Sequence, residues 1–225
     1  MTFSIVGRSS RSGSFGVAIT TSSICVGARC PHARAGAGAV ATQNITDPGL
    51  GPLLLDELEA GFEAEEALEH ITSRRANLDY RQLTVIDSQG RTACFTGANI
   101  LGVNAESAGE NCFAAGNLLA DTGVPAAMTE AFALNEEHHL AERLLRSLEA
   151  GLKAGGEEGT VHSAALLVVH QHPFPLVDLR VDWHDEDPVG QLRGLWTAYE
   201  PQMIDYLNRA VDPAQAPSYG VPGDE

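Results

Sequence analysis

Lysine is nearly absent from this sequence of 225 residues. Of its 14 basic residues, only Lys153 is a lysine. A P-loop nucleotide site and a Schiff-base enzyme each need a lysine at a defined position. Lys153 lies instead at an expected helix end, followed by Ala154 and Gly155. The sequence therefore argues against both classes.

Positive charge and long apolar runs are also scarce. Thirty acidic residues against 14 basic ones give a net charge of −16. Such a chain is repelled by nucleic-acid phosphates and by anionic membranes, so we expect neither as a partner. The longest apolar run has six residues, Ala164–Val169, whereas a bilayer span needs about 20. No basic and apolar leader precedes the first strand-like segment, so we expect a cytoplasmic protein.

Motifs for metals and cofactors are missing as well. The four cysteines form no CxxC pair, and the gap between Cys25 and Cys30 is at the outer limit of zinc spacing. We expect reduced, idle thiols, no metal and no cofactor. There is no HExxH, GxSxG or GxGxxG pattern. His138 and Glu142 share a helical face, which keeps a metal-dependent hydrolase as a weaker alternative.

Along the chain, segments whose apolar residues are spaced as in strands alternate with segments whose apolar residues are spaced as in helices. Helical spacing is expected over 53–62, 65–74, 125–153 with a break near Asn135, and 189–210. The predicted strands are 2–6, 14–21, 25–29, 37–43, 82–87, 91–96, 112–115, 163–170 and 176–183. The order predicts one α+β domain over 1–210 with antiparallel sheets, followed by a Pro/Gly-rich tail over 211–225.

Thr2 is the most informative candidate for chemistry. A small residue after the initiator allows removal of Met1, which leaves threonine at the N-terminus. Its hydroxyl can then attack a carbonyl while its own α-amine takes the proton. An α-amine has a pKa of about 7.7–8.0, close to working pH, so no lysine is required.

Several blocks of sequence resemble one bacterial and archaeal family, domain of unknown function 1028. The similarity spans about residues 2–190 and is carried by residues 1–6, 31–43, 81–87, 95–97, 116–119, 163–169 and 176–182. That family is grouped with the N-terminal-nucleophile hydrolases. The resemblance implies a four-layer αββα sandwich with Thr2 as the nucleophile. It implies no substrate.

Polar residues near strand ends supply candidates for binding. Asn117 follows a glycine, and its amide is a candidate oxyanion donor. His32, Gln43 and Asn44 are candidates for binding a polar substrate, although loop or turn chemistry explains His32 and Asn44 equally well.

Asp178, Arg180 and Asp182 alternate along one predicted strand and therefore share a face. An arginine held between carboxylates is suited to gripping a carboxylate or ureide group. A solvated row of ion pairs is the alternative interpretation. We include Asp178 and Arg180 among the candidate binding residues.

These observations predict a hydrolase of a C–N bond, amide or ureide, in a small polar substrate. The alternative is a catalytically silent ligand-binding or assembly protein, because no lysine lies near Thr2. Arg29 and Arg34 supply charge there but cannot accept a proton. A homodimer is expected because the last helix has apolar residues to spare, namely Leu195, Trp196, Tyr199, Met203 and Tyr206.

Overall fold

The computed structural model describes residues 1–221 and consists of ten strands, six α-helices and four short 3-10 turns over that range. The strands are β1 (Thr2–Arg8), β2 (Phe15–Thr21), β3 (Pro31–Arg34), β4 (Gly38–Asn44), β5 (Arg81–Asp87), β6 (Thr92–Thr96), β7 (Ala105–Gly109), β8 (Cys112–Asn117), β9 (Ser163–Val169) and β10 (Val177–Val181). The helices are α1 (Leu50–Glu59), α2 (Ala64–Thr72), α3 (Val124–Ala133), α4 (Leu140–Lys153), α5 (Pro188–Tyr199) and α6 (Met203–Val211).

The strands form two antiparallel sheets. The six-stranded sheet has the order β10-β9-β2-β1-β8-β7, and the four-stranded sheet has the order β3-β4-β5-β6. β1 lies in the middle of the larger sheet, paired with β2 and β8 along its length. Both edges of β1 are therefore hydrogen-bonded. Helices α3 and α4 cover one face and strands β4 and β5 cover the other, which explains why six of its seven residues are buried.

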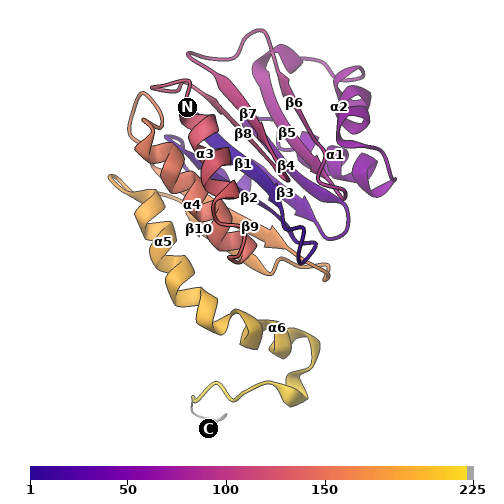
Figure 1. Ribbon diagram of the computed structural model, residues 1–225, viewed down its shortest axis with the longest axis vertical. Coiled ribbons are helices and arrows are strands. Elements are labelled where there is room, and N and C mark those ends of the chain that lie inside the picture. Colours follow the sequence, from indigo (N-terminus) through magenta and orange to yellow (C-terminus); the bar gives the residue numbers. More distant parts are fainter. Residues whose placement is uncertain (222–225) are drawn as a thin grey trace.

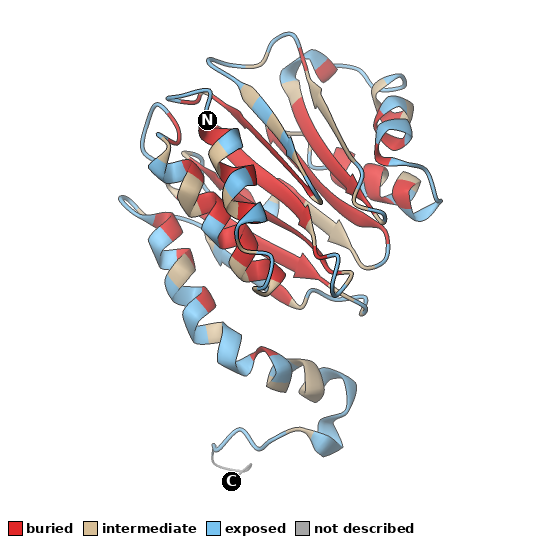
Figure 2. Ribbon diagram, viewed as in Figure 1, coloured by how far each residue is buried: buried red, intermediate tan, exposed pale blue. Residues whose placement is uncertain are grey.

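Three apolar clusters define four layers. One cluster joins the six-stranded sheet to α3, α4 and α5, and a second joins the four-stranded sheet to α1 and α2. The third lies between the two sheets. Figure 1 shows the two sets of helices on opposite sides of the sheets, and Figure 2 shows buried residues concentrated in the strands and on the inner helix faces. The predicted αββα sandwich is confirmed.

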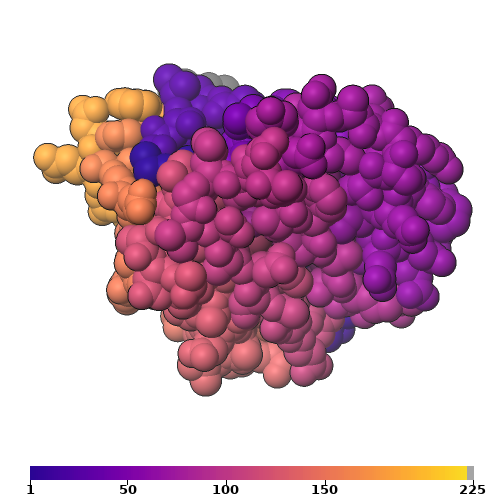
Figure 3. All heavy atoms as spheres, turned by 90° about the horizontal axis from the view of Figure 1, so that it is seen from above, coloured from indigo at the N-terminus to yellow at the C-terminus, as the bar shows by residue number. Residues whose placement is uncertain are grey.

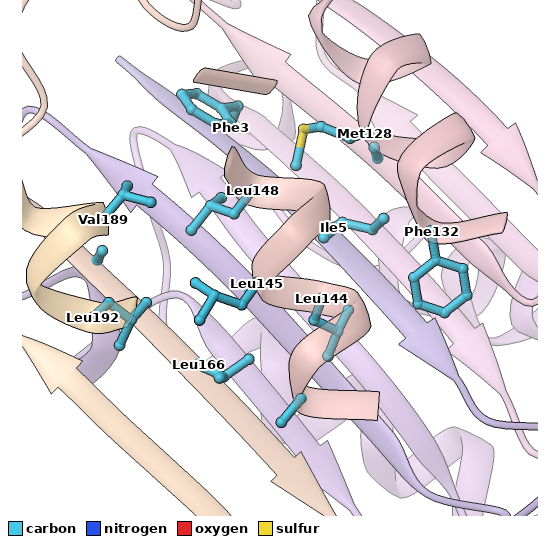
Figure 4. Packing of buried hydrophobic residues seen from close by; sticks show 14 of the residues in the cluster. Phe3, Ile5, Met128, Phe132, Leu144, Leu145, Leu148, Leu166, Val189 and Leu192 are labelled. Carbon is cyan, nitrogen blue, oxygen red and sulfur yellow. The ribbon is translucent and has the colours of Figure 1, made fainter. Parts of the chain in front are cut away.

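Close approach of α3 and α4 to the larger sheet depends on a glycine pair. Gly7 of β1 lies opposite Gly16 of β2. A Cβ on Gly7 would lie 2.7 Å from Phe132, and a Cβ on Gly16 would lie 2.7 Å from Leu144. The absence of both side chains lets these large residues pack directly on the sheet, beside Ile5 (Figure 4).

Three predictions about the strands were wrong. Residues 25–29 form no strand, because Cys25 takes a left-handed conformation and the turn η1 (Val26–Ala28) follows it. The expected loop after it contains β3, a short edge strand that begins with proline, a position where the missing N–H is tolerated. The sequence analysis missed β7, an edge strand of small and polar residues.

The C-terminal helical segment is divided rather than continuous. α5 and α6 are separated by the turn η3 (Glu200–Gln202), and Figure 1 shows α6 extending away from the sandwich. Two residues expected to be spare are buried: Trp196 is 1 % exposed, packed in the helix-side core, and Met203 is 8 % exposed. Of the predicted tail, residues 222–225 lie outside the described range. Within that range no helix is both long and apolar enough to cross a membrane.

Candidate active site at the N-terminal strand

Thr2 is the first residue of the central strand β1, opposite Thr21 on β2 and Asn117 on β8. Alternate residues of a strand face opposite ways. Phe3 belongs to the core beneath the helices, whereas Val6 belongs to the core between the sheets. Thr2 shares the face of Val6, so its side chain is directed toward the space between the sheets, and the residue is only 5 % exposed.

The Thr2 hydroxyl is held in a cluster of oxygens. Oγ1 donates to the carbonyl oxygen of Met1 at 2.5 Å and lies 3.0 Å from Thr21 Oγ1. The Thr21 hydroxyl also donates to the Met1 carbonyl oxygen. While Met1 is attached, the nitrogen of Thr2 is an amide and cannot accept a proton. With Met1 attached, the Thr2 hydroxyl therefore has no α-amine of its own residue to accept its proton.

A chain of buried side chains, called here the polar network, connects the two sheets beside Thr2. Ser4 Oγ donates to Gln43 Oε1 at 2.7 Å, and Gln43 Nε2 donates to Gln82 Oε1 at 2.7 Å. Asn117 Nδ2 donates to the same Gln82 oxygen at 3.3 Å. Gln43 and Gln82 also donate to backbone carbonyls of β8. Gln43 is thus engaged within the protein, where it fixes the spacing of the sheets.

Asn117 and the residue after it have unusual features. Asn117 is fully buried, and its Oδ1 has no hydrogen-bond partner among the described residues. Leu118 has φ of 50°, a conformation that is strained for a bulky residue. Its N–H donates to Leu101 and its carbonyl accepts from Glu158, which stabilises the turn. Strained residues of this kind concentrate at functional sites.

Sequence reasoning missed Glu157, which lies near the N-terminus. Leu119 forms a bridge with Glu157, and the side chain of Met1 lies against Gly159. Glu157 is 6 % exposed, and neither carboxylate oxygen has a well-aligned hydrogen bond among the described residues. In the sequence the segment 155–159 reads as an exposed turn of glycines and glutamates, so it carries no signal of burial. Figure 3 shows the first residues, in darkest indigo, at the surface beside pink and orange atoms of later segments.

Burial controls the ionisation of Glu157. Removal from water raises the pKa of Glu157 to about 8, although the N-terminal ammonium and the N–H of Ser22 act in the opposite direction. A buried carboxyl group beside the start of the chain is thus a weak acid that exchanges its proton near neutral pH.

His32 and Asn44 lie on the four-stranded sheet but not at Thr2. The His32 ring packs against Gly51 of α1, on the face of the sheet away from Thr2, and its Nε2 lies 3.2 Å from the Arg29 carbonyl oxygen. Burial lowers the pKa of His32. Asn44 has φ of 71° and ties β4 to Tyr80 and Leu101 by hydrogen bonds of 2.8 and 3.3 Å. The structure places neither the His32 imidazole nor the Asn44 amide beside the Thr2 hydroxyl.

Asp178 and Arg180 form a pair on the edge strand β10. Arg180 Nε and Nη2 donate to the two Asp178 oxygens at 2.7 and 2.9 Å. β9 and β2 separate this strand from β1, which places the pair about 14 Å from Thr2 across the sheet. The stem of Arg180 packs on Gly27. The pair is partly exposed and separate from the polar network.

The structure does not assemble a metal site from the histidines. His139 caps α4 and stacks on Trp196, while Glu142 binds Arg146, Arg193 and Trp196 rather than His138. Within residues 1–221, no group of three potential ligand side chains is placed to hold an ion. All four cysteines are free thiols, and burial raises the pKa of Cys30, Cys94 and Cys112.

A surface hollow of about 500 Å³ lies elsewhere, between the β3–β4 turn and the β9–β10 loop. Its lining includes Arg34, Glu59, His172 and Phe174. Val169, which also lines it, pairs with Phe15. Phe15 is the first residue of β2, whereas Thr21 is its last. The hollow is thus about 20 Å from Thr2 along the strands.

Comparison with known proteins agrees with the fold and identifies the family. The model of a family of unknown function, DUF1028, matches residues 2–192. The chain belongs to the DUF1028 family. A crystal structure of a DUF1028 protein from Silicibacter pomeroyi is 35 % identical, covers 88 % of each chain and superposes with a TM-score of 0.81.

A structure of Anbu, the ancestral beta-subunit from Yersinia bercovieri, is 11 % identical with a TM-score of 0.39, covering 91 % of this chain and 97 % of its own. No curated protein matches this DUF1028 chain. The function is therefore argued from the site itself.

Proposed function

We propose that this chain, after removal of Met1, hydrolyses a C–N bond, amide or ureide, in a small polar substrate, with Thr2 as the nucleophile. The observation that carries the proposal is the position of Thr2. The second residue of the chain begins the central strand, and its hydroxyl faces the polar network between the sheets. An αββα sandwich with a threonine at this place fits the N-terminal-nucleophile type of hydrolase.

The proposed reaction uses one residue as both nucleophile and base. Once Met1 is absent, the Thr2 nitrogen is a primary amine and accepts the proton of its own hydroxyl as Oγ1 attacks the carbonyl carbon. The C–N bond then breaks, and the amine returns the proton to the departing nitrogen. Water hydrolyses the resulting ester and frees Thr2 for another cycle.

Asn117 is the proposed stabiliser of the negative oxygen that forms during attack. It lies directly across from Thr2, and its Nδ2 carries a second N–H beyond the one donated to Gln82. Because the polar network already holds the Asn117 amide in place, this donor does not have to reorganise during the reaction. Gln43 acts indirectly, by holding Gln82. The proposal does not use His32, Asn44, Asp178 or Arg180, because the geometry does not bring them together with Thr2.

The test combines intact mass with a screen for hydrolysis. Mass spectrometry of the protein from its native host is expected to show a chain without Met1. Against a panel of small amides and ureides, the Thr2→Ala variant is expected to lose activity by about a thousandfold or more. Thr2→Ser keeps a hydroxyl and an amine and should retain measurable activity.

Thr122→Ala is the matched control, because this threonine is exposed beside α3 and should leave the rate unchanged. A full-length mass with Met1 in place would contradict the proposal, because the Thr2 nitrogen would then be an amide. Unchanged activity of a trimmed Thr2→Ala protein would contradict it as well.

The second candidate is a catalytically silent ligand-binding protein. The surface hollow favours it, because Arg34 and Glu59 offer charged groups at its wall and Phe174 offers an apolar surface. Under this alternative, ligands bind equally to the natural chain and to Thr2→Ala, while Arg34→Ala weakens binding. Calorimetry with the compounds of the same panel separates the two candidates.

Assembly into a homodimer in the cytoplasm is a further part of the proposal. The support is α6, which extends from the sandwich and exposes Ile204 and Tyr206. Leu195 on α5 is also exposed. Sedimentation of the natural chain is expected to give twice the chain mass, and Ile204→Glu with Tyr206→Glu is expected to give the monomer. A natural chain that sediments as a monomer would contradict the dimer.

A further inference from the structure

Buried acceptors with few donors gather around the start of the chain. Among the described residues the buried side-chain oxygens without a well-aligned hydrogen bond include both oxygens of Glu157 and Oδ1 of Asn117. Of the described groups, only the N–H of Ser22 and the N-terminal ammonium act on Glu157. Such groups are expensive to leave unpaired. Asn117 lies opposite Thr2, and Glu157 bridges to Leu119, two residues further along. Their shared location indicates that a donor-rich group belongs between them.

The missing donor is supplied by the chain itself. The nitrogen of Thr2 carries a single N–H while Met1 is attached, but three after its removal, together with a positive charge. Met1 now occupies the adjoining space, with its side chain against Gly159. Loss of Met1 therefore moves the N-terminal cation from the Met1 nitrogen to the Thr2 nitrogen, beside these side-chain oxygens.

We propose that Glu157 receives the α-ammonium of the trimmed Thr2 as an ion pair and so holds the amine beside the Thr2 hydroxyl. This inference rests on the proposed function. Asn117 Oδ1 accepts a second N–H and orients the amine. When the ammonium releases a proton to water, the neutral amine keeps this position and has a free lone pair for the Thr2 hydroxyl proton.

The charges already present support the pairing. In the chain that bears Met1, burial raises the pKa of Glu157, while the N-terminal ammonium and the N–H of Ser22 lower it. The charge at the start of the chain therefore already acts on the Glu157 carboxyl group. Other charged or titratable groups on neighbouring segments include Asp121, Lys153, Glu158 and His162. Glu157 is thus a positioning residue that acts through the amine, in a chain whose only lysine is Lys153.

The experiment measures the ionisation of the Thr2 amine directly, without any substrate. Protein labelled with ¹³C-threonine and shown by mass to lack Met1 is titrated by NMR. The Thr2 signal is identified by its absence in Thr2→Ser. In Glu157→Gln, the acid dissociation constant of the Thr2 ammonium is expected to rise at least tenfold, because a nearby anion no longer stabilises the cation. Glu158→Gln, which changes an exposed neighbour, is expected to leave it unchanged.

A second measurement on the unmutated protein keeps the test valid if Glu157→Gln does not fold. With ¹³C-labelled glutamate, the Glu157 carboxyl carbon, identified by its absence in Glu157→Asp, and the Thr2 signal should share a titration step, because interacting groups titrate as a pair.

Three results would overturn the inference. One is a Thr2 dissociation constant within twofold of the natural value in Glu157→Gln, and another is an equal change in Glu158→Gln. The third is the absence of a shared step in the unmutated protein. A protein that retains Met1 overturns the proposed function and this pairing together. A trimmed protein whose Thr2 titration is independent of Glu157 overturns the pairing alone.

Discussion

The layer between the two sheets has two ends of opposite character, although the same strands run through both. One end is apolar and is filled by Val6, Phe15, Val17, Ile86 and Phe113. The other end is polar and contains Thr2, Ser4, Gln43, Gln82 and Asn117, all buried. A sandwich gains stability from apolar contacts, whereas buried polar groups cost free energy unless every hydrogen bond is made.

The comparison teaches that the polar end gives up apolar contacts that the other end makes, which is what the proposed function requires around Thr2. The chain satisfies its Gln43 and Gln82 amides by hydrogen bonds between the sheets. It nevertheless leaves acceptors unpaired at Asn117 and Glu157. Under the proposed function, this end must hold a polar nucleophile, so apolar side chains cannot fill it. The four predictions below test this division through stability, from the largest effect to the smallest.

The largest expected effect is the pH dependence that Glu157 imposes on the chain bearing Met1. The folded chain keeps this proton up to a pKa of about 8, whereas the unfolded chain releases it near 4.5. Between these values the folded state binds more protons, so the free energy of unfolding falls as pH rises. Glu157→Gln does not titrate and should be more stable than the natural chain above pH 8, by about 5 kcal/mol.

Urea denaturation at pH 5 and pH 8.5, on protein whose mass includes Met1, measures this effect. The two chains should differ little at pH 5. Equal stability of both chains at pH 8.5 would contradict the burial of an acid at the polar end.

Truncation at the apolar end has the next largest effect. Ile86 is fully buried, and Ile86→Ala should lower the free energy of unfolding by about 3 kcal/mol through lost burial and a cavity. Activity per folded molecule should be unchanged, because Ile86 touches no group of the proposed site. A loss below about 1 kcal/mol in urea denaturation would show that this end is not the main source of inter-sheet stability.

Breaking the polar network has a smaller effect that depends on both partners. Gln82→Leu removes the acceptor for Gln43 and Asn117 and should cost about 2 kcal/mol. The double variant Gln43→Leu with Gln82→Leu should cost less than the sum of the single variants, by about 1 kcal/mol. Gln89→Leu, at an exposed turn, is the control. Strict additivity in thermal or urea unfolding would show that the two amides do not act as a unit.

The smallest effect is expected at the Asp178–Arg180 pair, outside the inter-sheet layer. Both side chains are more than a third exposed, at 35 % and 41 %. Asp178→Asn should therefore change the free energy of unfolding by less than about 0.5 kcal/mol, with less effect at high salt. A tenfold loss of hydrolysis in this variant would instead place the pair in the substrate site.

Much of the fold could be predicted from the sequence, because the periodicity of apolar residues indicates which faces of a strand or helix are buried. The hairpin of β5 and β6 and the paired helices α3 and α4 lie close to their predicted ranges. β3 and β7 were not found, because short edge strands need few apolar residues and draw their hydrogen bonds from a neighbouring strand. The strand predicted over 25–29 was wrong, because a short apolar segment can bury its side chains over β9 as a turn as well as in a strand.

The candidate site was predictable only in part. Thr2 could be proposed because the N-terminal-nucleophile mechanism depends on a position directly after Met1 rather than on neighbours in space. Gln43 and Asn117 could be proposed from strand ends, but their connection through Gln82 requires knowledge of which strands face each other. Glu157 could not be found, because nothing in a run of glycine and glutamate reveals that one carboxyl group is buried.

The sequence by itself determined the α+β class, the negative charge, the near absence of lysine and the position of a threonine directly after Met1. These properties follow from composition and from short stretches of sequence, so they do not depend on contacts between distant residues. Only the tertiary structure decided which polar residues meet, because the contacts of Ser4 with Gln43 and of Leu119 with Glu157 join positions 39 and 38 residues apart. Burial and pKa arise from such distant contacts, so the polar end of the sandwich exists only in the folded chain.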